Sequence, residues 1–265
     1  DILPTLRDPV SGWKNFVPFF YAATADVLGV ILMTRRDQTP FLLALAILLA
    51  AHGHIVASYL VHEAAYASIF KESWATEQFG VVCLWLAGCP YADFDHVRKM
   101  HIAHHKDRAD VVEFDYRDFV KKSGSFRRIV LALEWAFIPV VETIMHVRCA
   151  LYPISSKKCT RSRRKSASIG SPAVLVLYLF LWRRGALLPH LLSGALVLLV
   201  LSYHDAFQHT YEAVLMENYT PGPGKRTAQF EEENTYSNMI SVRYPLLNLL
   251  SLNFGYHNAH HKKPM

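Results

Sequence analysis

The stretch His101-Ile-Ala-His-His105 recurs as His257-Asn-Ala-His-His261, and this repeat decides how the chain is interpreted. On a helix, positions i, i+3 and i+4 lie on one face, so each triplet would direct three imidazoles towards one point. Neutral imidazole binds iron, copper, zinc and nickel, and two triplets exceed the ligands that one tetrahedral zinc ion takes. A polar surface patch would explain one histidine pair but not two copies of the same pattern. The repeat therefore predicts a histidine-rich centre that holds two metal ions.

The composition is typical of a membrane protein. Hydrophobic residues make up 52% of the 265 residues and charged residues only 19%. The four cysteines show no Cys-x-x-Cys spacing, so no disulfide framework is expected. The net charge of +6 is uneven, because Lys157–Lys165 carries six Lys or Arg and no acid. Beside an apolar segment, such a run favours contact with a membrane surface over nucleic acid.

Four apolar segments have about the ~20 residues that a bilayer core requires. They are residues 16–33, 41–61, 166–182 and 185–203. A fifth apolar run, Ile129–Val147, contains Glu134, Pro139 and Glu142. Because acids inside a membrane are costly, we expect this run to form an interfacial or buried helix.

The number of spans places the histidine-rich segments on one side of the membrane. Two spans lie between residue 165 and the second triplet, so residues 63–165 and 204–265 are expected to form one cap. The excess of Lys and Arg assigns this cap and both termini to the cytoplasm. We therefore expect one all-α integral membrane domain over residues 1–265, with four spanning helices and a cytoplasmic helical cap around the di-metal site. Because the chain has no initiator methionine and stops at Met265, we also expect the natural protein to be longer.

Further candidate ligands lie where the predicted spans end. His62 closes the second span, and Asp205 and His209 are spaced i, i+4 at the end of the fourth. A metal transporter would place its ligands near the middle of the bilayer, whereas these residues lie at span ends or in the cap. This position favours catalysis at the membrane surface, and a metal transporter or metal sensor is the alternative from another functional class.

At these residues the sequence resembles the membrane fatty-acid desaturase superfamily, which includes hydroxylases and carotenoid hydroxylases and ketolases. His101–His105, followed by Glu113-Phe-Asp-Tyr116, is similar to the second histidine box of that family and the acidic element after it. Asn253–His261 is similar to the third box, and the preceding Asn234–Ser237 is also family-like. The resemblance covers most of the chain from about His52 onward.

Two elements depart from the family pattern. Asp205-x-x-x-His209 matches an Asn-x-x-x-His element that supplies a further ligand in some desaturases, with Asp in place of Asn. The first box usually has a second histidine three or four residues after the first, whereas Tyr66 follows His62 here. A phenol with a pKa near 10 is a poorer ligand for ferrous iron than imidazole. We therefore expect Tyr66 to lie beside the metal ligands and not on the metal.

The resemblance implies a di-iron centre that uses O2 as co-substrate. It also implies an external electron donor of the ferredoxin or cytochrome b5 type, with its reductase. The expected iron ligands are His62, His101, His104, His105, Asp205, His209, His257, His260 and His261. The residues expected to support these ligands by hydrogen bonds or charge are Glu63, Tyr66, His96, Glu113, Asp115 and His204.

The expected reaction is oxidation of unactivated C–H bonds in a lipid-like substrate, and desaturation is the favoured form of this reaction. Hydroxylation or ketone formation on an isoprenoid, terpenoid or carotenoid is the alternative, because both reactions begin with hydrogen abstraction. An apolar substrate would enter from the bilayer. The expected location is the endoplasmic reticulum membrane in a eukaryote or the inner membrane in a bacterium, with a cytoplasmic active site and no nucleic-acid partner.

Overall fold

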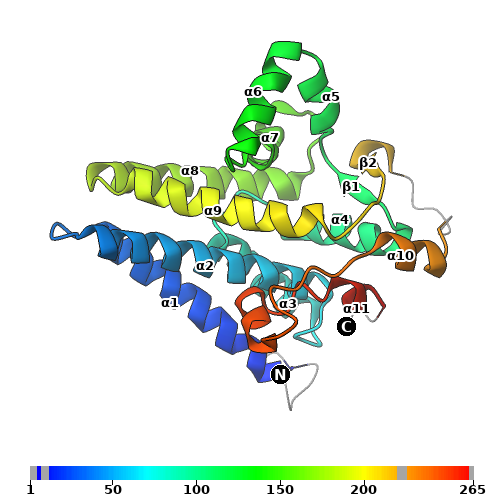
Figure 1. The fold of residues 1–265 in the computed structure, drawn as a ribbon, viewed down its shortest axis with the longest axis horizontal. Helices are drawn as coiled ribbons and strands as arrows, with labels where there is room; N and C mark the ends of the chain where they lie inside the picture. Colours follow the sequence, from blue (N-terminus) through cyan, green and yellow to red (C-terminus); the bar gives the residue numbers. More distant parts are fainter. Residues whose placement is uncertain (1–4, 7–11, 220–225, 263–265) are drawn as a thin grey trace. The chain divides into compact units, whose positions relative to one another are not determined.

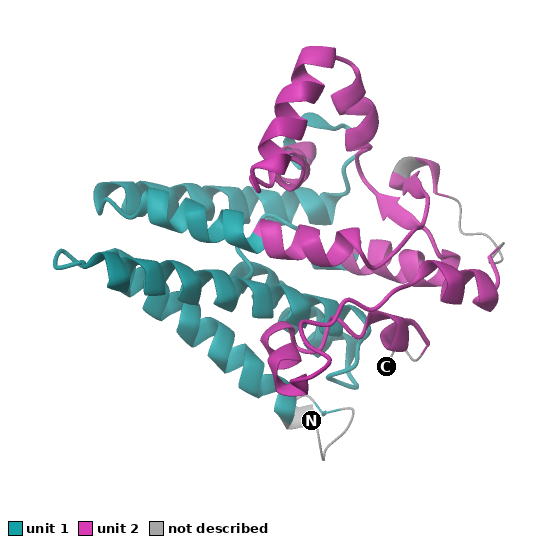
Figure 2. Cartoon of the chain, in the orientation of Figure 1, with its two compact units in different colours: residues 1–95, 153–197 teal, residues 96–152, 198–265 magenta. Residues whose placement is uncertain are grey.

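The structure, a computed structural model, describes residues 5–6, 12–219 and 226–262. These residues are mostly helical (Figure 1). The chain divides into two compact units (Figure 2). Unit 1 contains residues 1–95 and 153–197, and unit 2 contains residues 96–152 and 198–265. The end of the chain at Met265 lies outside the described residues.

Unit 1 contains most of the long apolar helices. Its elements are η1 (Gly12–Asn15), α1 (Phe16–Met33), α2 (Pro40–Ala65), α3 (Ser73–Leu86), α8 (Arg161–Arg183) and the first part of α9 (Leu187–Ala206). Glycines let α1 and α2 pack closely, since a Cβ on Gly29 would lie 2.8 Å from the carbonyl oxygen of Ala46. Small residues that allow such backbone contact are typical of helix pairs in membranes. Met33 and Leu181 are fully buried in the same core cluster.

The four predicted spanning helices are confirmed. Helices α1, α2, α8 and α9 are each long and apolar enough to cross a membrane. Helices α2 and α8 begin before their apolar runs because threonines cap them. The side chain of Thr39 accepts a hydrogen bond from the backbone of Leu42, and that of Thr160 accepts one from Arg163. The side of the membrane on which the cap lies stays a prediction.

The fifth apolar run differs from the single helix that the sequence predicts. It forms α6 (Gly124–Trp135) and α7 (Val140–Ser155), whose axes bend by 113°. Between them Phe137 has a left-handed φ of 58°, and Pro139 has no N–H to continue a helix. The carboxylate of Glu134 then accepts a hydrogen bond from the backbone N–H of Val141 at 2.7 Å. Glu134, one of the acids that argue against a membrane span, thus caps the start of α7. Helices α6 and α7 would add a fifth span only if the bent pair crossed the membrane as one span.

Unit 2 contains shorter elements. They are α4 (Phe94–Asp107), β1 (Asp110–Val112), α5 (Tyr116–Lys121), α6, most of α7, the end of α9, β2 (Ala213–Leu215), η2 (Met216–Asn218), α10 (Ala228–Asn234), η3 (Pro245–Ser251) and α11 (His257–Lys262). Strands β1 and β2 pair in parallel, with Asp110 opposite Ala213. The all-helical prediction did not include them, because three-residue strands are too short to show an alternating pattern. Their pairing joins the chain after α4 to the chain after α9.

Candidate metal centre

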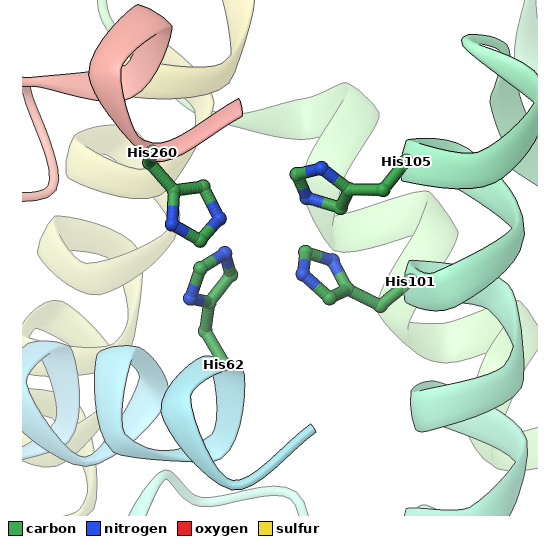
Figure 3. Close-up of side chains that lie close together, drawn as sticks. All are labelled: His62, His101, His105 and His260. Carbon is green, nitrogen blue, oxygen red and sulfur yellow. The ribbon is translucent and has the colours of Figure 1, made fainter. Parts of the chain in front are cut away.

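The first histidine triplet lies on α4. Its spacing puts His101, His104 and His105 on one helix face. Helix α4 is followed by Arg108, whose left-handed φ of 50° turns the chain back. The turn brings the carbonyl oxygen of Ala109 to 3.0 Å from Nδ1 of His104. Figure 3 shows His101 and His105 projecting from the same side of α4.

The second triplet lies on the short helix α11, which the preceding loop holds in place. Asn253 has a left-handed φ of 63° in that loop. At Gly255 a Cβ would lie 2.9 Å from the carbonyl oxygen of Asn238, so the backbone approach needs glycine. The side-chain amide of Asn258 donates to the carbonyl oxygen of Thr235 at 2.8 Å. The family-like segment before the third box therefore anchors the helix that carries it.

His209 is positioned by a short extended pairing. It forms an antiparallel bridge with Thr235, and the backbone N–H of Tyr236 donates to the carbonyl oxygen of Gln208 at 2.9 Å. The ring of His209 stacks on Tyr211, with ring centroids 4.4 Å apart and planes 21° apart. The segment after α9 thus presents His209 beside the triplets of α4 and α11.

Four histidines of unit 2 form what we call the first histidine group. Their ligand atoms all lie within 4.8 Å of one another. The Nε2 atom of His209 lies 3.0 Å from that of His104 and 2.7 Å from that of His257. The Nε2 atoms of His257 and His261 are 3.1 Å apart. The group consists of His104, His209, His257 and His261.

The hydrogen bonds of the outer nitrogens fix the proton on two of these rings. Nδ1 of His104 faces the carbonyl oxygen of Ala109, and Nδ1 of His261 faces a carboxylate oxygen of Glu231, each at 3.0 Å. Both oxygens accept, so each Nδ1 carries the ring proton and each neutral Nε2 carries a lone pair. The three close Nε2–Nε2 contacts run from His104 through His209 and His257 to His261. Protons on Nε2 of His209 and His257 turn at most two of these contacts into hydrogen bonds. A bound cation relieves all three, so this donor set fits a transition-metal ion.

Burial favours the neutral form of three of these rings, those of His209, His257 and His261. Loss of hydration, followed by the effect of neighbouring histidines, lowers the pKa of His209 and of His261 to about 3. The same two causes lower the pKa of His257 well below the ordinary histidine value. Neutral imidazole is the form that binds metal, so these three rings are ready to bind an ion at neutral pH.

Three more histidines of unit 2 form the second histidine group, His101, His105 and His260. Their ligand atoms also lie within 4.8 Å of one another (Figure 3). The ring centroids of His101 and His105 are 4.8 Å apart, and those of His105 and His260 are 5.1 Å apart. Burial and the neighbouring histidines lower the pKa of His105. The two groups adjoin, because the rings of His105 and His261 are 4.0 Å apart.

The candidate residues of the first box lie at the end of α2 in unit 1. His62 is in the last turn, and its Nδ1 lies 3.5 Å from a carboxylate oxygen of Glu63. Tyr66 follows the helix, and its ring contacts that of His62 edge-on, with centroids 5.2 Å apart. Burial, and then the charge of Glu63, raise the pKa of Tyr66 above its ordinary value. The phenol therefore keeps its proton at neutral pH.

Asp205 and His204 lie in the last turn of α9, and the structure brings neither into a histidine group. His204 is buried, and its carbonyl oxygen accepts a hydrogen bond from the side chain of Asn238 at 3.0 Å.

The acidic element after the second box has two different roles. Nε2 of His96 lies against a carboxylate oxygen of Glu113 within unit 2. Asp115 caps α5, where one carboxylate oxygen accepts from the backbone N–H groups of Arg117 at 2.8 Å and Asp118 at 3.3 Å. Glu113 thus contacts a histidine, whereas Asp115 begins a helix.

Three partners of the histidines were missed in the sequence: Glu231, the carbonyl oxygen of Ala109, and Asp110, whose carboxylate oxygen lies 3.4 Å from Nδ1 of His104. One carboxylate oxygen of Glu231 accepts from His261, and the other lies 2.9 Å from Nε of Arg108. In the run Glu231-Glu-Glu233 no pattern indicates which carboxylate faces a histidine. The carbonyl oxygen of Ala109 belongs to the backbone and leaves no trace in residue type.

Comparison with known proteins gives one family. The fatty acid desaturase family model matches residues 39–265, which is most of the chain. No curated protein and no solved structure matches the sequence.

Proposed function

The chain belongs to the fatty acid desaturase family, and on this basis we propose that it is an O2-dependent membrane oxidoreductase that desaturates a lipid acyl chain at a di-iron centre. The observation that carries the proposal is the pair of adjoining histidine groups in unit 2. One group would hold each iron. When bound, the two iron ions would supply the O2 chemistry that attacks an unactivated C–H bond.

The first histidine group would hold one iron with four imidazoles. The second group would hold the other iron with His101, His105, His260 and His62 as a fourth ligand. The assignment of His62 rests on its place in the sequence, at the end of the second predicted span, where it corresponds to the first histidine of the first box. We also propose that Asp205 lies close enough to offset the positive charge, since Asp205-x-x-x-His209 takes the place of a family ligand element.

The chain's own residues would orient the proposed ligands and keep water away from them. Ala109 and Glu231 hold the outer nitrogens of His104 and His261, so their Nε2 lone pairs keep one direction. Tyr211 is buried, stacks on His209 and also stacks on Phe230, with ring centroids 5.9 Å apart. This aromatic layer excludes water from one side of the group, which limits side reactions.

The family and the apolar helices support proposals for the substrate, the electron donor and the location. The proposed substrate is a lipid that reaches the site from the bilayer, and the proposed donor is a ferredoxin or cytochrome b5 type protein with its reductase. We further propose that the chain acts as a single domain with its active site on the cytoplasmic side.

Metal analysis combined with product analysis tests the function. The protein is expressed in an iron-replete host supplied with candidate lipids, and iron per chain, O2 consumption and lipid products are measured. We expect two irons per chain and an acyl product with a new double bond. Full turnover with zinc, or one metal per chain, would refute the di-iron proposal. A hydroxylated isoprenoid or an isoprenoid ketone as product would show that the reaction is hydroxylation or ketone formation and not desaturation. His52→Gln is the control for loss of a histidine outside both groups and should keep iron content and turnover, because His52 hydrogen-bonds to Tyr21 on α1.

Cysteine labelling tests the side of the membrane. In a background without the native cysteines, Thr5→Cys and Lys158→Cys should react with an impermeant thiol reagent from the same, cytoplasmic side. Labelling of the two positions from opposite sides would contradict the four-span arrangement.

A further inference from the structure

A cavity of about 510 Å³ lies between the end of α7 and the start of α8, entirely within unit 1. We propose that it binds an anionic glycerophospholipid of the surrounding bilayer. Its lining includes Ile154, Arg164, Ala167, Ser171, Pro172 and Leu175. No histidine of either group lines it, so the inference is independent of the proposed function.

The walls of the cavity suit an acyl chain. Ile154 is 75% exposed and Leu175 is 59% exposed, whereas Ala167 is buried. Leu175 lies on α8, which is able to span a membrane, and a large exposed apolar side chain on such a helix faces lipid, whereas Ile154 lies on α7. Ala167 leaves room between the two helices because its side chain is small, and Pro172 adds an apolar ring. A hydrocarbon chain fills such a space without losing any hydrogen bond.

One hydroxyl in the cavity lacks a partner. The side-chain oxygen of Ser171 is buried, and among the described residues no hydrogen-bond partner reaches it. Burying a hydroxyl without a hydrogen bond is unfavourable, so such an atom points to a ligand or a water. The carbonyl oxygen of a glycerol ester accepts a hydrogen bond and occurs where the acyl chain of a phospholipid ends. The position of Ser171 within apolar walls therefore matches the ester region of a lipid.

The rim of the cavity suits a phosphate. The guanidinium of Arg164 donates to the carbonyl oxygens of Ser156 at 3.2 Å and Lys157 at 3.0 Å, which holds the basic loop at the start of α8. Arg161 and Lys165 are exposed beside it. Lys157–Lys165 contains six cationic residues and no acid, all of the six except the buried Arg163 are exposed, and the positive end of the α8 dipole adds to this charge.

The alternative occupant of the basic run is an acidic protein, such as an electron donor. A protein would use the exposed charges, but it would not reach the buried hydroxyl of Ser171 between the helices. A phospholipid uses the charges, the hydroxyl and the apolar walls together. The combination therefore favours lipid.

Lipid retention measured by native mass spectrometry tests the proposal. The full chain is reconstituted in nanodiscs of phosphatidylcholine with phosphatidylglycerol, then released and analysed. We expect the wild type to retain phosphatidylglycerol in preference to phosphatidylcholine. Arg161→Gln and Lys165→Gln should each reduce this preference roughly 5-fold, since a cation near an anionic surface contributes on the order of 1 kcal/mol. The matched controls Arg183→Gln and Arg184→Gln, at the other end of α8, should leave it unchanged.

Two further variants test the cavity itself. Leu175→Trp fills the space and should abolish lipid retention, whereas Leu179→Trp, one turn further along the same helix and outside the lining, should not. Ser171→Ala should not destabilise the lipid-free protein, because it removes a hydroxyl without a partner, but it should reduce the rise in Tm caused by phosphatidylglycerol. Equal retention of the two lipids by the wild type, or full retention by Leu175→Trp, would overturn the proposal. Loss of electron-donor coupling in Arg161→Gln with unchanged lipid binding would assign the basic run to a protein partner instead.

Discussion

The two histidine groups differ in where their ligands come from. All four members of the first group belong to unit 2, and the outer nitrogens of His104 and His261 have defined acceptors. The second group has three members in unit 2, and its proposed fourth ligand, His62, belongs to unit 1. A site completed within one folded unit is organised before the ion arrives, whereas a site that needs a residue from elsewhere is not. We therefore expect the first group to bind iron more tightly.

Removing a buried member of the first group should have the largest effect. His257 is 4% exposed, and its Nε2 lies between those of His209 and His261. His257→Ala should lose the iron of the first group and all measurable turnover. His104→Ala should behave in the same way. Iron per chain and O2 consumption are the measurements, and a His257→Ala protein with two irons would refute the assignment of this group.

The corresponding change in the second group tests the difference directly. His260→Ala should lose turnover but keep about one iron per chain, because the first group remains complete. Titration of metal-free wild type with ferrous iron should likewise show a tighter and a weaker site. Two equal sites would show that the first group does not bind iron more tightly, and loss of both irons in His260→Ala would show that the first group is not organised independently of the second.

Glu231 should have the next largest effect. Glu231→Ala removes the acceptor of Nδ1 of His261 and a partner of Arg108, and loss of such support typically costs 10–100-fold in metal affinity or activity. Glu231→Gln keeps an acceptor for His261 and should recover part of the affinity. Iron affinity by competition with a chelator is the measurement.

Glu232→Ala is the matched control for Glu231. Glu232 is exposed and pairs with Lys262 at 2.7 Å, and an exposed ion pair contributes little. Equal effects of Glu231→Ala and Glu232→Ala would show that Glu231 does not act through His261.

The sequence predicted the parts of the molecule that periodicity encodes. Four apolar runs became α1, α2, α8 and α9, and the repeated histidine spacing placed each triplet on a helix. The bend between α6 and α7 was not predicted, because it depends on a left-handed φ at Phe137 and a hydrogen bond from Val141 to Glu134. Neither feature changes the hydropathy pattern.

The supporting residues of the site could be predicted only in part. His96 and Glu113 were chosen for residue type and position; they contact each other, and their support of the metal ligands stays a prediction. Asp115 was chosen on the same grounds, yet it caps α5. Glu231 was missed because its role depends on the packing of α10 against α11, which residue type does not encode. Repeated spacing in the sequence thus identifies candidate ligands, whereas the contacts that support them need the tertiary structure.

Acid should reduce the stability of the metal-free protein through the histidines of the first group. A histidine whose pKa is lowered on folding binds fewer protons in the folded state, so protons favour unfolding. The pKa of His209 and of His261 falls from 6.5 to about 3 on folding. The contribution of these two histidines to the free energy of unfolding should therefore be fully present above pH 6.5 and should be lost as the pH falls towards 3. Tm measured against pH checks this, and bound iron should move the decrease to lower pH because it competes with protons. A Tm that stays constant from pH 7 to 5 without metal would contradict it.

Tyr66 should have the smallest effect, and it tests the completeness of the second group. Its ring contacts His62, but its raised pKa keeps the phenol protonated, and ferrous iron favours neutral imidazole over a phenol that must lose a proton. Tyr66→Phe keeps the ring and removes only the hydroxyl. The variant should keep both irons and lose only part of its activity, about the few-fold expected for one hydrogen bond of about 1 kcal/mol. Wild-type ferric protein should also show no phenolate-to-iron absorption band. Loss of one iron in Tyr66→Phe, together with such a band in the wild type, would make Tyr66 a ligand and complete the second group with a residue other than histidine.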